Sequence, residues 1–378
     1  MTKGIILSGG WGTRLRPLTC TIPKTLIPVV NRPVIERQMI LLKSAGVKEI
    51  ILAVSVMSEV LQNYFRNGEK LGVTIQYTNE KHPMGTAGAI KLAEAYLKDE
   101  NFFMLNGDVI LNFNFLEMLN FHNESGCIGT IASKIVEDPT RYGVLITEEK
   151  TNKVIKFQEK DEYKSATGKP IPMPINAGVY ILEPEIFSYI ESNKKVSIER
   201  DIFPKIADQK KLQHYPLSGI WRDIGNPYDL LQGNIAFMND TLNNLKEKKK
   251  NLIDDSAKID LTVKILPPCT IGEKVIIRKN STIGPNVIIG DNVYIDNNTE
   301  IINSLIYSEV YISKNVNIEN SIVSDNCQIG ENVKIKGFGE NLVVLSSYVD
   351  VLKDIKLLAK QNRSISFCHH ETVKENID

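Results

Sequence analysis

The sequence predicts an α/β domain built on a mostly parallel sheet, followed by a left-handed parallel β-helix of hexapeptide repeats. Three observations support this fold class. The chain has 378 residues, and single hydrophobic cores stop growing at roughly 250–300 residues. Up to about residue 235, short β-rich runs alternate with helical patterns. Beyond residue 251, isoleucine recurs at every sixth position.

The first part predicts strands separated by amphipathic helices. Such βαβ units form a parallel sheet with helices on both faces, and ligands bind at the carboxyl ends of its strands. We therefore expect a site in the loops after Leu7 and Leu105. The expected strands are Lys3–Leu7, Glu49–Val54, Thr74–Tyr77, Phe102–Leu105 and Cys127–Ser133, and the expected helices include Arg32–Ala45 and Gly88–Leu97.

The second part repeats with a period of six. Nine isoleucines from Ile253 to Ile301 keep this spacing, and the register slips by one residue at Ile306 and again at Val323. A period of six fits neither a helix nor a hairpin, but it fits a triangular coil with a buried aliphatic residue at each corner. Fifteen such anchors, the last at Ile335, predict about five turns of β-helix.

The predicted domain borders follow from these patterns. The α/β domain covers 1–235, a linker helix 236–252, the β-helix 253–336, and a partly helical tail 337–378. An apolar stripe predicts that the helix begins at Tyr228 and ends in the lysines before Asn251. In the tail, Val349 to Ala359 is expected to form a short capping helix over the open end of the coil.

Composition excludes several classes of protein. The 45 Lys and Arg balance the 45 Asp and Glu, which leaves no long-range field to attract nucleic acid or anionic lipid. The longest uncharged stretch, Pro170 to Leu182, is too short for a membrane helix of about 20 residues, and the N-terminus does not resemble a signal peptide. Five dispersed cysteines without a CxxC pattern favour a cytoplasmic protein without disulfides.

A glycine-rich run, SGGWGTRLRP, follows the first predicted strand. Its glycines allow backbone N–H groups to approach phosphate oxygens, and Arg14 supplies bidentate positive charge. No Gly-Lys-Ser/Thr follows, and Leu15 occupies the third glycine position of a dinucleotide fingerprint, so the run is neither of those motifs. Lys24, in the stiff IPKTL turn, adds a second cation. A plain glycine-rich turn is the alternative interpretation.

Two carboxylates are candidates for a Mg²⁺ site. Asp108 ends the apolar strand FFMLN, and Asp223 lies in the similar setting GIWRDIG. Mg²⁺ typically binds one or two carboxylates together with phosphate oxygens. A helix cap or turn residue is the alternative for Asp108. Glu159 and Lys160 follow another strand and precede a polar segment, 161–174, that is expected to be a mobile loop over the site or an ordinary surface loop.

With these motifs in place, the chain resembles the sugar-phosphate nucleotidylyltransferases, and among them the mannose-1-phosphate guanylyltransferase branch. The resemblance rests on SGGWGTRLRPLT, IPKTLIPV, MGTAGAIKLA, FFMLNGDVI, EDPTRYGVL, INAGVYIL, SIERDIFPKIA and WRDIGNPYDLL, which occur in that order. It implies a Rossmann-like nucleotidyltransferase catalytic domain with a hexapeptide coil. The implied reaction joins GTP and mannose 1-phosphate into GDP-mannose and pyrophosphate, with Mg²⁺ as cofactor.

The resemblance also implies roles for individual residues. The catalytic set would be Arg14, Lys24, Asp108, Lys160 and Asp223, with Asp108 and Asp223 holding the metal ion. The nucleotide would contact Leu7, Gly9, Gly10, Gly12, Thr13, Glu80, Gly85, Thr86, Asn106 and Gly107. The sugar would contact Gly143, Glu159, Asn176 and Gly178.

Two departures and several alternatives accompany the resemblance. Asp161 follows Lys160 where the family usually has proline, and Glu80 replaces the glutamine of several branches. An acidic acceptor suits the N1–H and 2-amino donors of guanine. A UTP-, dTTP- or ATP-dependent glucose-1-phosphate enzyme and a non-catalytic regulatory subunit are the alternatives. A bifunctional enzyme whose coil also transfers an acyl group is a further alternative. Such coils generally use a histidine base, and there is none between Ile253 and Lys336, so this alternative depends on His369 and His370 in the tail. The flat faces of the coil predict a homo-oligomer.

Overall fold

A computed structural model describes residues 2–80, 82–148, 151–160, 163, 170–245 and 249–377. The chain forms two compact units. The first contains Met1–Trp11 and Val34–Trp221, and the second contains Gly12–Pro33 and Arg222–Asp378. The sequence prediction assigned Gly12–Pro33 to the first domain, but its contacts group this segment with the C-terminal part of the chain.

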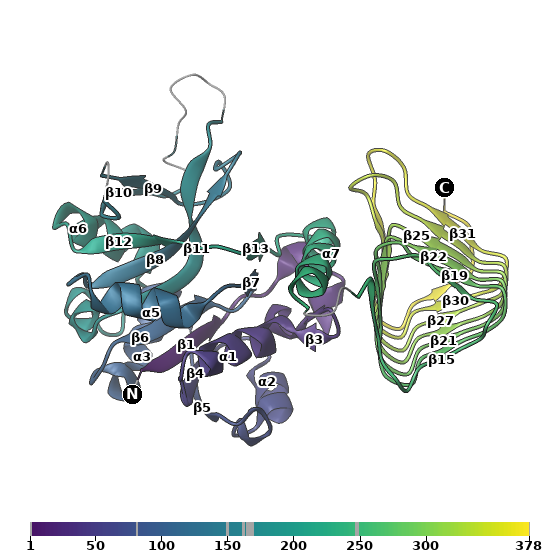
Figure 1. The fold of residues 1–378 in the computed structure, drawn as a ribbon, viewed down its shortest axis with the longest axis horizontal. Coiled ribbons are helices and arrows are strands. Elements are labelled where there is room, and N and C mark those ends of the chain that lie inside the picture. Colours follow the sequence, from purple (N-terminus) through teal and green to yellow (C-terminus); the bar gives the residue numbers. More distant parts are fainter. Residues whose placement is uncertain are drawn as a thin grey trace. The chain divides into compact units, whose positions relative to one another are not determined.

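The first unit is built on a nine-stranded mixed sheet (Figure 1). Its centre is the predicted parallel arrangement, because β1 (Lys3–Ser8) pairs in parallel with both β4 (Glu49–Val54) and β6 (Phe102–Asn106), and β5 (Thr74–Asn79) pairs with β4. The antiparallel strand β11 (Met173–Leu182) lies on the other side of β6. The remaining strands are β8 (Gly129–Val136), β9 (Val144–Thr147), β10 (Val154–Gln158) and β12 (Leu212–Pro216), with a separate ladder of β7 (Val109–Asn112) and β13 (Ile220–Asp223).

Helices cover this sheet because its central strands are apolar on both faces. Five of the six residues of β4 are buried, as expected for a parallel strand between two helical layers. The predicted helix over 32–45 begins at Val34, and the one over 88–97 is divided at Ala93 into two helices. The helices are α1 (Val34–Ser44), α2 (Ser58–Phe65), α3 (Gly85–Leu92), α4 (Glu94–Leu97), α5 (Phe115–Asn123) and α6 (Phe203–Asp208), and a π-helical turn, η6, covers Ile198–Ile202.

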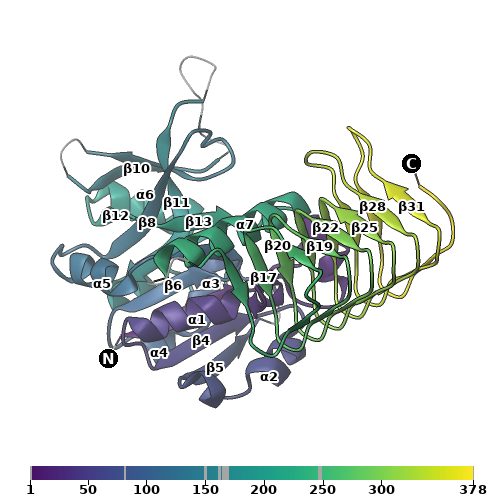
Figure 2. The same ribbon diagram turned by 45° about the vertical axis from the view of Figure 1, so that its right-hand side comes forward.

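The second unit contains the β-helix, whose short strands stack into three parallel sheets (Figure 2). The fold class predicted from the sequence is therefore confirmed. The first sheet contains β14 (Asn251–Ile253), β17 (Cys269–Ile271), β20 (Val287–Ile289), β23 (Ser304–Ile306), β26 (Ser321–Val323), β29 (Val343–Leu345) and β32 (Ile365–Phe367). The second contains β15 (Lys258–Ile259), β18 (Ile276–Ile277), β21 (Tyr294–Ile295), β24 (Tyr311–Ile312), β27 (Gln328–Ile329), β30 (Asp350–Val351) and β33 (Thr372–Val373). The third contains β16 (Lys264–Ile265), β19 (Thr282–Ile283), β22 (Glu300–Ile302), β25 (Asn317–Glu319), β28 (Lys334–Lys336) and β31 (Lys356–Leu358).

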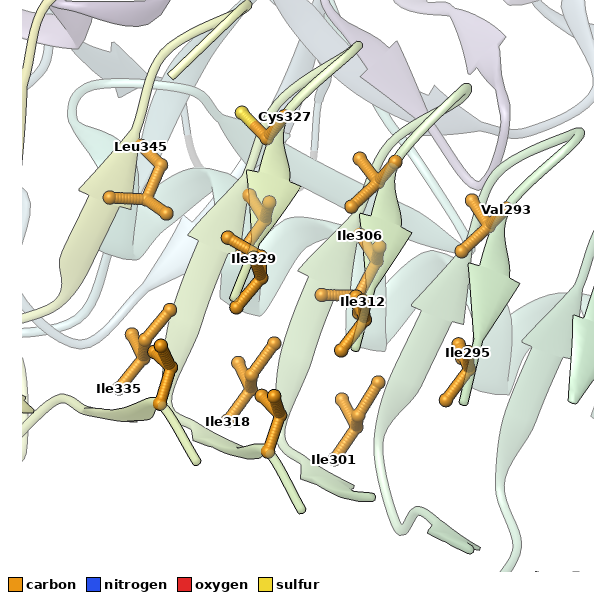
Figure 3. Close-up of a cluster of buried hydrophobic side chains, with 14 of the residues drawn as sticks. Val293, Ile295, Ile301, Ile306, Ile312, Ile318, Cys327, Ile329, Ile335 and Leu345 are labelled. Atoms are coloured by element: carbon orange, nitrogen blue, oxygen red, sulfur yellow. The ribbon is translucent and has the colours of Figure 1, made fainter. Parts of the chain in front are cut away.

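The periodic isoleucines point into the coil, as Figure 3 shows for Ile295, Ile301 and Ile312. The strand register also explains the slips of the repeat. Ile271 pairs with Ile289, eighteen residues further on, whereas Ile289 pairs with Ile306 after only seventeen. The lost residue therefore shortens one turn without moving the corner residue out of the core.

The prediction of a partly helical tail over 337–378 is wrong. The coil continues through Val373, and the expected helix at 349–359 contains β30 and β31. The repeat is hidden because Ile335 and Leu345 are ten residues apart instead of six. The extra residues form a small loop closed by a bridge between Phe338 and Asn341, and a second bridged loop at 360–363 interrupts the following turn.

Asparagines at the turns form a column along the coil that the sequence prediction did not include. Asn280, Asn298, Asn315 and Asn332 all have φ near +60°, a region that asparagine tolerates better than most residues. Each donates through Nδ2 to the side chain one turn further on, ending at Asp354 Oδ1 at 2.8 Å. The column satisfies polar groups at a corner where the strand ladders stop.

The second unit also contains α7 (Pro227–Asn244) and a hairpin of β2 (Pro28–Val29) and β3 (Arg32–Pro33). Asn226 caps α7 by accepting the Asp229 N–H, and the helix ends at Asn244 rather than at the predicted Lys250. The lysines at 246 and 248, which were expected to close the helix, lie outside the described residues. Within the described ranges, no helix combines the length and apolarity that a bilayer crossing requires.

Candidate active site

The glycine turn after β1 lies beside Glu80 in the first unit. Ser55 Oγ donates to the Gly9 carbonyl at 2.7 Å, and a Cβ atom on Gly9 would lie 3.2 Å from that hydroxyl and 3.9 Å from Glu80 Oε1. A Cβ atom on Gly10 would meet no atom within 4 Å. Glu80 accepts the Met84 N–H at 3.0 Å, and burial raises the pKa of its carboxyl while that hydrogen bond opposes the rise. The turn and Glu80 therefore form one surface.

Gly85 and Thr86 begin α3 and are held against the segment before η6. Gly85 has a φ of +73°, and a Cβ atom there would lie 2.5 Å from the Val196 carbonyl oxygen, so only glycine fits. Thr86 Oγ1 accepts the Ile198 N–H at 2.8 Å and donates to Glu199 Oε2 at 2.6 Å. Its hydroxyl proton is thus already used within the protein.

The loops after β1 and β6 meet, as the parallel sheet predicted. The Gly107 N–H donates to the Leu7 carbonyl at 2.9 Å, and Gln38 Nε2 donates to the Asn106 carbonyl at 2.9 Å. Asp108 follows in the turn before β7 and is partly exposed. Gly178 on β11 has a φ of +72°, and a Cβ atom there would come within 2.9 Å of Asn106 Nδ2. Glycine at 178 is needed for this close approach.

The four predicted sugar-binding residues come together from β9, β10 and β11 and their ends. The Asn176 N–H donates to the Gly143 carbonyl at 2.8 Å, and Asn176 Oδ1 accepts the Gly178 N–H at 3.0 Å. A Cβ atom on Gly143 would lie 3.4 Å from Glu159 Oε1. The structure therefore gathers a backbone carbonyl, an amide and a carboxylate, which are suitable partners for the hydroxyl groups of a hexose.

Glu199 completes this cluster. It lies in SIERDIFPKIA, one of the runs on which the resemblance rests, but the sequence analysis assigned it no role. Its carboxylate accepts hydrogen bonds from Thr86 Oγ1 at 2.6 Å, Ser197 Oγ at 2.8 Å and Tyr180 Oη at 3.5 Å. Tyr180 Oη in turn accepts from Asn176 Nδ2 at 2.9 Å. A continuous chain of side chains thus joins the predicted nucleotide-binding end at Thr86 to the predicted sugar-binding end at Asn176.

Two carboxylates close together shape the electrostatics of the cluster. Burial raises the pKa of the Glu159 carboxyl, the negative charge of Glu199 raises it further, and Arg200, 3.7 Å from Glu159 Oε2, opposes both effects. Tyr180 is fully buried, so burial and the same Glu199 charge hold the pKa of its phenol well above the usual value. The phenol therefore stays protonated and donates to Glu199.

Several of the remaining predicted residues lie in the Gly12–Pro33 segment of the second unit. Gly12 precedes the short helix η1 (Thr13–Leu15), which contains Thr13 and Arg14, and Lys24 begins η3 (Lys24–Leu26). Thr19 Oγ1 donates to the Gly12 carbonyl at 2.8 Å, and a Cβ atom on Gly12 would lie 3.1 Å from Lys24 Cβ. The structure therefore brings Gly12 and Lys24 together.

Asp223, Lys160 and the loop beyond it complete the predicted set. Asp223 ends β13 and belongs to the second unit, whereas Asp108 belongs to the first. Lys160 is exposed just after β10. Of the predicted mobile loop at 161–174, residues 161, 162 and 164–169 lie outside the described residues. Within the described ranges, no group of three or more His, Cys, Asp or Glu side chains could hold a metal ion.

Comparison with known proteins gives this arrangement a family. The family described as Nucleotidyl transferase matches residues 3–240, and the family described as GMPPB C-terminal domain matches residues 265–378. The chain is 44% identical over 241 residues to a protein of Saccharomyces cerevisiae named mannose-1-phosphate guanyltransferase. That match covers 63% of this chain and only 65% of the yeast protein, slightly less than two thirds of its length.

A further relative and a solved structure agree with this match. A mannose-1-phosphate guanyltransferase of Eremothecium gossypii is 41% identical over 268 residues, which cover 68% of this chain and 73% of that protein. The crystal structure of HddC from Yersinia pseudotuberculosis, complexed with GMP-PN, superposes with a TM-score of 0.52 at 27% identity and covers 63% of this chain and 100% of that one. The chain therefore belongs to the nucleotidyl transferase family.

Proposed function

We propose that this protein transfers the guanylyl group of GTP to mannose 1-phosphate, which yields GDP-mannose and pyrophosphate. The observation that carries the proposal is the identity of 41–44% to proteins named mannose-1-phosphate guanyltransferase. The cluster of Gly143, Glu159 and Asn176 supports it, because it offers hydrogen-bond partners to several hydroxyl groups of a hexose at once. Glu80, beside Gly9, is an acceptor of the kind that guanine requires.

The chemistry needs charge neutralisation rather than a general base. A sugar 1-phosphate is largely dianionic at neutral pH, because the second pKa of a phosphomonoester is about 6. Its oxygen attacks the α-phosphorus of the triphosphate, and the bond from that phosphorus to the bridging oxygen breaks, so that pyrophosphate leaves. In this scheme Arg14 and Lys24 hold the triphosphate and Lys160 holds the sugar phosphate, which lowers the repulsion between two anions.

We infer that the metal ion is Mg²⁺, held by Asp108 and Asp223. The donor set fits this ion, since Mg²⁺ takes one or two carboxylates and completes its shell with water and phosphate oxygens. Asp108 is partly exposed in its turn, as a ligand to a substrate-bound ion must be. When bound, the ion would neutralise negative charge on the triphosphate. The two carboxylates would hold the ion where it can contact the phosphates of the nucleotide.

One assay tests the reaction and its alternatives together. Pyrophosphate release is measured with GTP, UTP, dTTP and ATP, each paired with mannose 1-phosphate, glucose 1-phosphate and a third hexose 1-phosphate. We expect GTP with mannose 1-phosphate to give the highest kcat/KM, and activity to disappear with EDTA and return with Mg²⁺. A higher value for any glucose pair would select the alternative substrate class. No release with any pair would select the regulatory subunit.

We further propose that the protein acts in the cytoplasm as a homo-oligomer assembled through the β-helix. All five cysteines are free, which suits a reducing compartment. On the outer face of one coil sheet, Tyr294 and Tyr311 stack with ring centroids 5.0 Å apart, and Arg278 lies over Tyr294. Tyrosine and arginine are enriched at protein interfaces. Light scattering at micromolar concentration should give a multiple of 42.5 kDa, and a monomer would contradict the proposal.

A further inference from the structure

One corner of the β-helix is bonded to the segment that contains the predicted phosphate-binding cations. Three successive contacts define this anchoring corner. The Ile289 carbonyl accepts from Asn31 Nδ2 at 2.7 Å, Tyr307 Oη donates to the Pro28 carbonyl at 3.4 Å, and Ser346 Oγ donates to the Pro17 carbonyl at 3.2 Å. These coil residues follow or end β20, β23 and β29, three strands of the same sheet. The contacts therefore extend along the coil.

Burial shows that the corner is packed rather than merely touched. The side chain of Tyr307 is 4% exposed and that of Ser346 is 0% exposed, although both stand at a turn of the coil. The hydroxyl of Ser346 is thus a polar group that must be paired inside the protein. Its partner, the Pro17 carbonyl, also accepts the Cys20 N–H at 3.1 Å. A hydroxyl of the coil therefore contributes to closing the turn just beyond Arg14.

The bonded segment, Gly12–Pro33, transmits this support because it is closed on itself. Thr19 donates a hydrogen bond to the Gly12 carbonyl, and Gly12 packs against Lys24. These contacts hold the turn that bears Arg14 close to the turn that bears Lys24. On its other side the Val30 N–H donates to Asn234 Oδ1 of α7 at 2.8 Å. The backbone that bears Arg14 and Lys24 is therefore held from the coil and from α7 at once.

We propose that the β-helix is a positioning element of the triphosphate site, and that its anchoring corner holds Arg14 and Lys24 in the geometry that binds the nucleotide phosphates. This rests on the proposed function for the role of the two cations. The coil then has a part in substrate binding in addition to any part in assembly. Tyr307 and Ser346 act through the segment and touch no substrate themselves.

The test compares variants of the full chain that differ by single hydroxyl groups. Ser346→Ala, Tyr307→Phe and the double variant remove hydroxyls that reach the segment. Ser321→Ala is the matched serine control, because Ser321 is also 0% exposed and its hydroxyl donates to the coil's own Glu319 carbonyl at 2.7 Å. Tyr348→Phe, at a coil tyrosine that is 46% exposed, is the tyrosine control. The Pro17 carbonyl keeps its Cys20 partner in Ser346→Ala, so that substitution leaves no unpaired carbonyl there.

Two readouts are taken for each variant. The first is backbone amide exchange over 12–27 by mass spectrometry, and the second is the dissociation constant of GTP by titration calorimetry in the presence of Mg²⁺. The double variant loses two neutral hydrogen bonds to the segment. If these have the ordinary net strength of such bonds, the double variant should bind GTP about tenfold more weakly than the wild type. Exchange over 12–27 should become severalfold faster, and both controls should match the wild type.

Each result decides something. Faster exchange together with weaker GTP binding in the anchoring variants alone supports the inference. Unchanged GTP affinity in the double variant overturns it, whether or not exchange changes, because the contact is then structural only. Equal weakening in Ser321→Ala also overturns it, since any coil serine would then have the same effect. Wild-type protein that binds GTP but releases no pyrophosphate would refute the proposed function and leave the positioning result standing.

Discussion

Replacement of Glu199 by glutamine isolates the chain of side chains that joins the two ends of the candidate site. The variant keeps the size of the side chain and removes its charge. In the wild type, the Glu199 carboxylate accepts hydrogen bonds from three hydroxyl groups, at 2.6 Å from Thr86, 2.8 Å from Ser197 and 3.5 Å from Tyr180. A glutamine oxygen can still accept from two of them, but the amide NH₂ must then face the Tyr180 hydroxyl.

The magnitude follows from what the Tyr180 hydroxyl can do in that variant. It already accepts from Asn176 Nδ2 at 2.9 Å, and its residue is 0% exposed, so its proton has no water to turn to. A hydrogen bond to a charged group is worth about 1.5–3 kcal/mol net. Because Glu199 itself is only partly buried, we take about 2 kcal/mol, which corresponds to roughly 30-fold in kcat/KM.

The assay is pyrophosphate release with GTP and mannose 1-phosphate, combined with thermal melting of each variant. Glu191→Gln is the control, since that exposed glutamate of the same region pairs with Lys194 and takes no part in the chain of side chains around Glu199. Tyr180→Phe should raise the KM for mannose 1-phosphate more than that for GTP, and Thr86→Val should do the reverse. If Glu199→Gln turned over within twofold of the wild type, or if it lost activity only in proportion to lost folded protein, the reasoning would be refuted.

Four other outcomes follow. Asp108→Ala or Lys160→Ala should abolish or strongly reduce turnover while circular dichroism and melting stay close to the wild type, and near wild-type rates would refute their assignment. Gly178→Ala should lower activity strongly, because φ is +72° there and the new Cβ atom would meet Asn106 Nδ2 at 2.9 Å; kinetics beside a crystal structure check this. Burial first, and then the charge of Glu199, raises the pKa of Glu159 above its usual 4.5. As the pH is lowered, affinity for mannose 1-phosphate should therefore begin to decrease while the pH is still above 4.5. Glu159→Gln should remove that part of a pH–KM profile. The folded protein binds this proton more readily than the unfolded chain, so the same protonation stabilises the fold as pH falls, and melting should show no loss from this group. Ile312→Ala, at a coil position that is 0% exposed, should lower the free energy of unfolding by about 2–5 kcal/mol in urea titrations, and a change below 1 kcal/mol would contradict the packing of the core.

The parts of the fold that were predictable are those that local patterns determine. The apolar runs after Lys3, Glu49 and Phe102 became β1, β4 and β6, because a strand buried on both faces needs continuous apolar sequence. The isoleucine period predicted the coil for a different reason, because each corner of the coil needs one buried apolar residue in six. It failed beyond Ile335 because two loops lengthen single steps from six residues to ten, which removes the period although the corners remain apolar.

The parts of the candidate site that were missed depend on contacts between residues far apart in the chain. Glu199 reaches Thr86 across 113 positions, through a π-helical turn that has no clear sequence signal. Ser346 reaches Pro17 across 329 positions, so the sequence could not reveal that the Gly12–Pro33 segment packs with the coil. Motif spacing identifies side chains with suitable chemistry, whereas the groups that hold them are set by tertiary packing.

The most direct measurement is a crystal structure of the full chain with a non-hydrolysable GTP analogue, mannose 1-phosphate and Mg²⁺. We expect a single divalent ion bound by Asp108, Asp223 and the triphosphate, with Arg14 and Lys24 on the phosphates of the nucleotide and Lys160 on that of the sugar. An ion that only one of the two carboxylates touches, or phosphates bound away from these cations, would contradict the account.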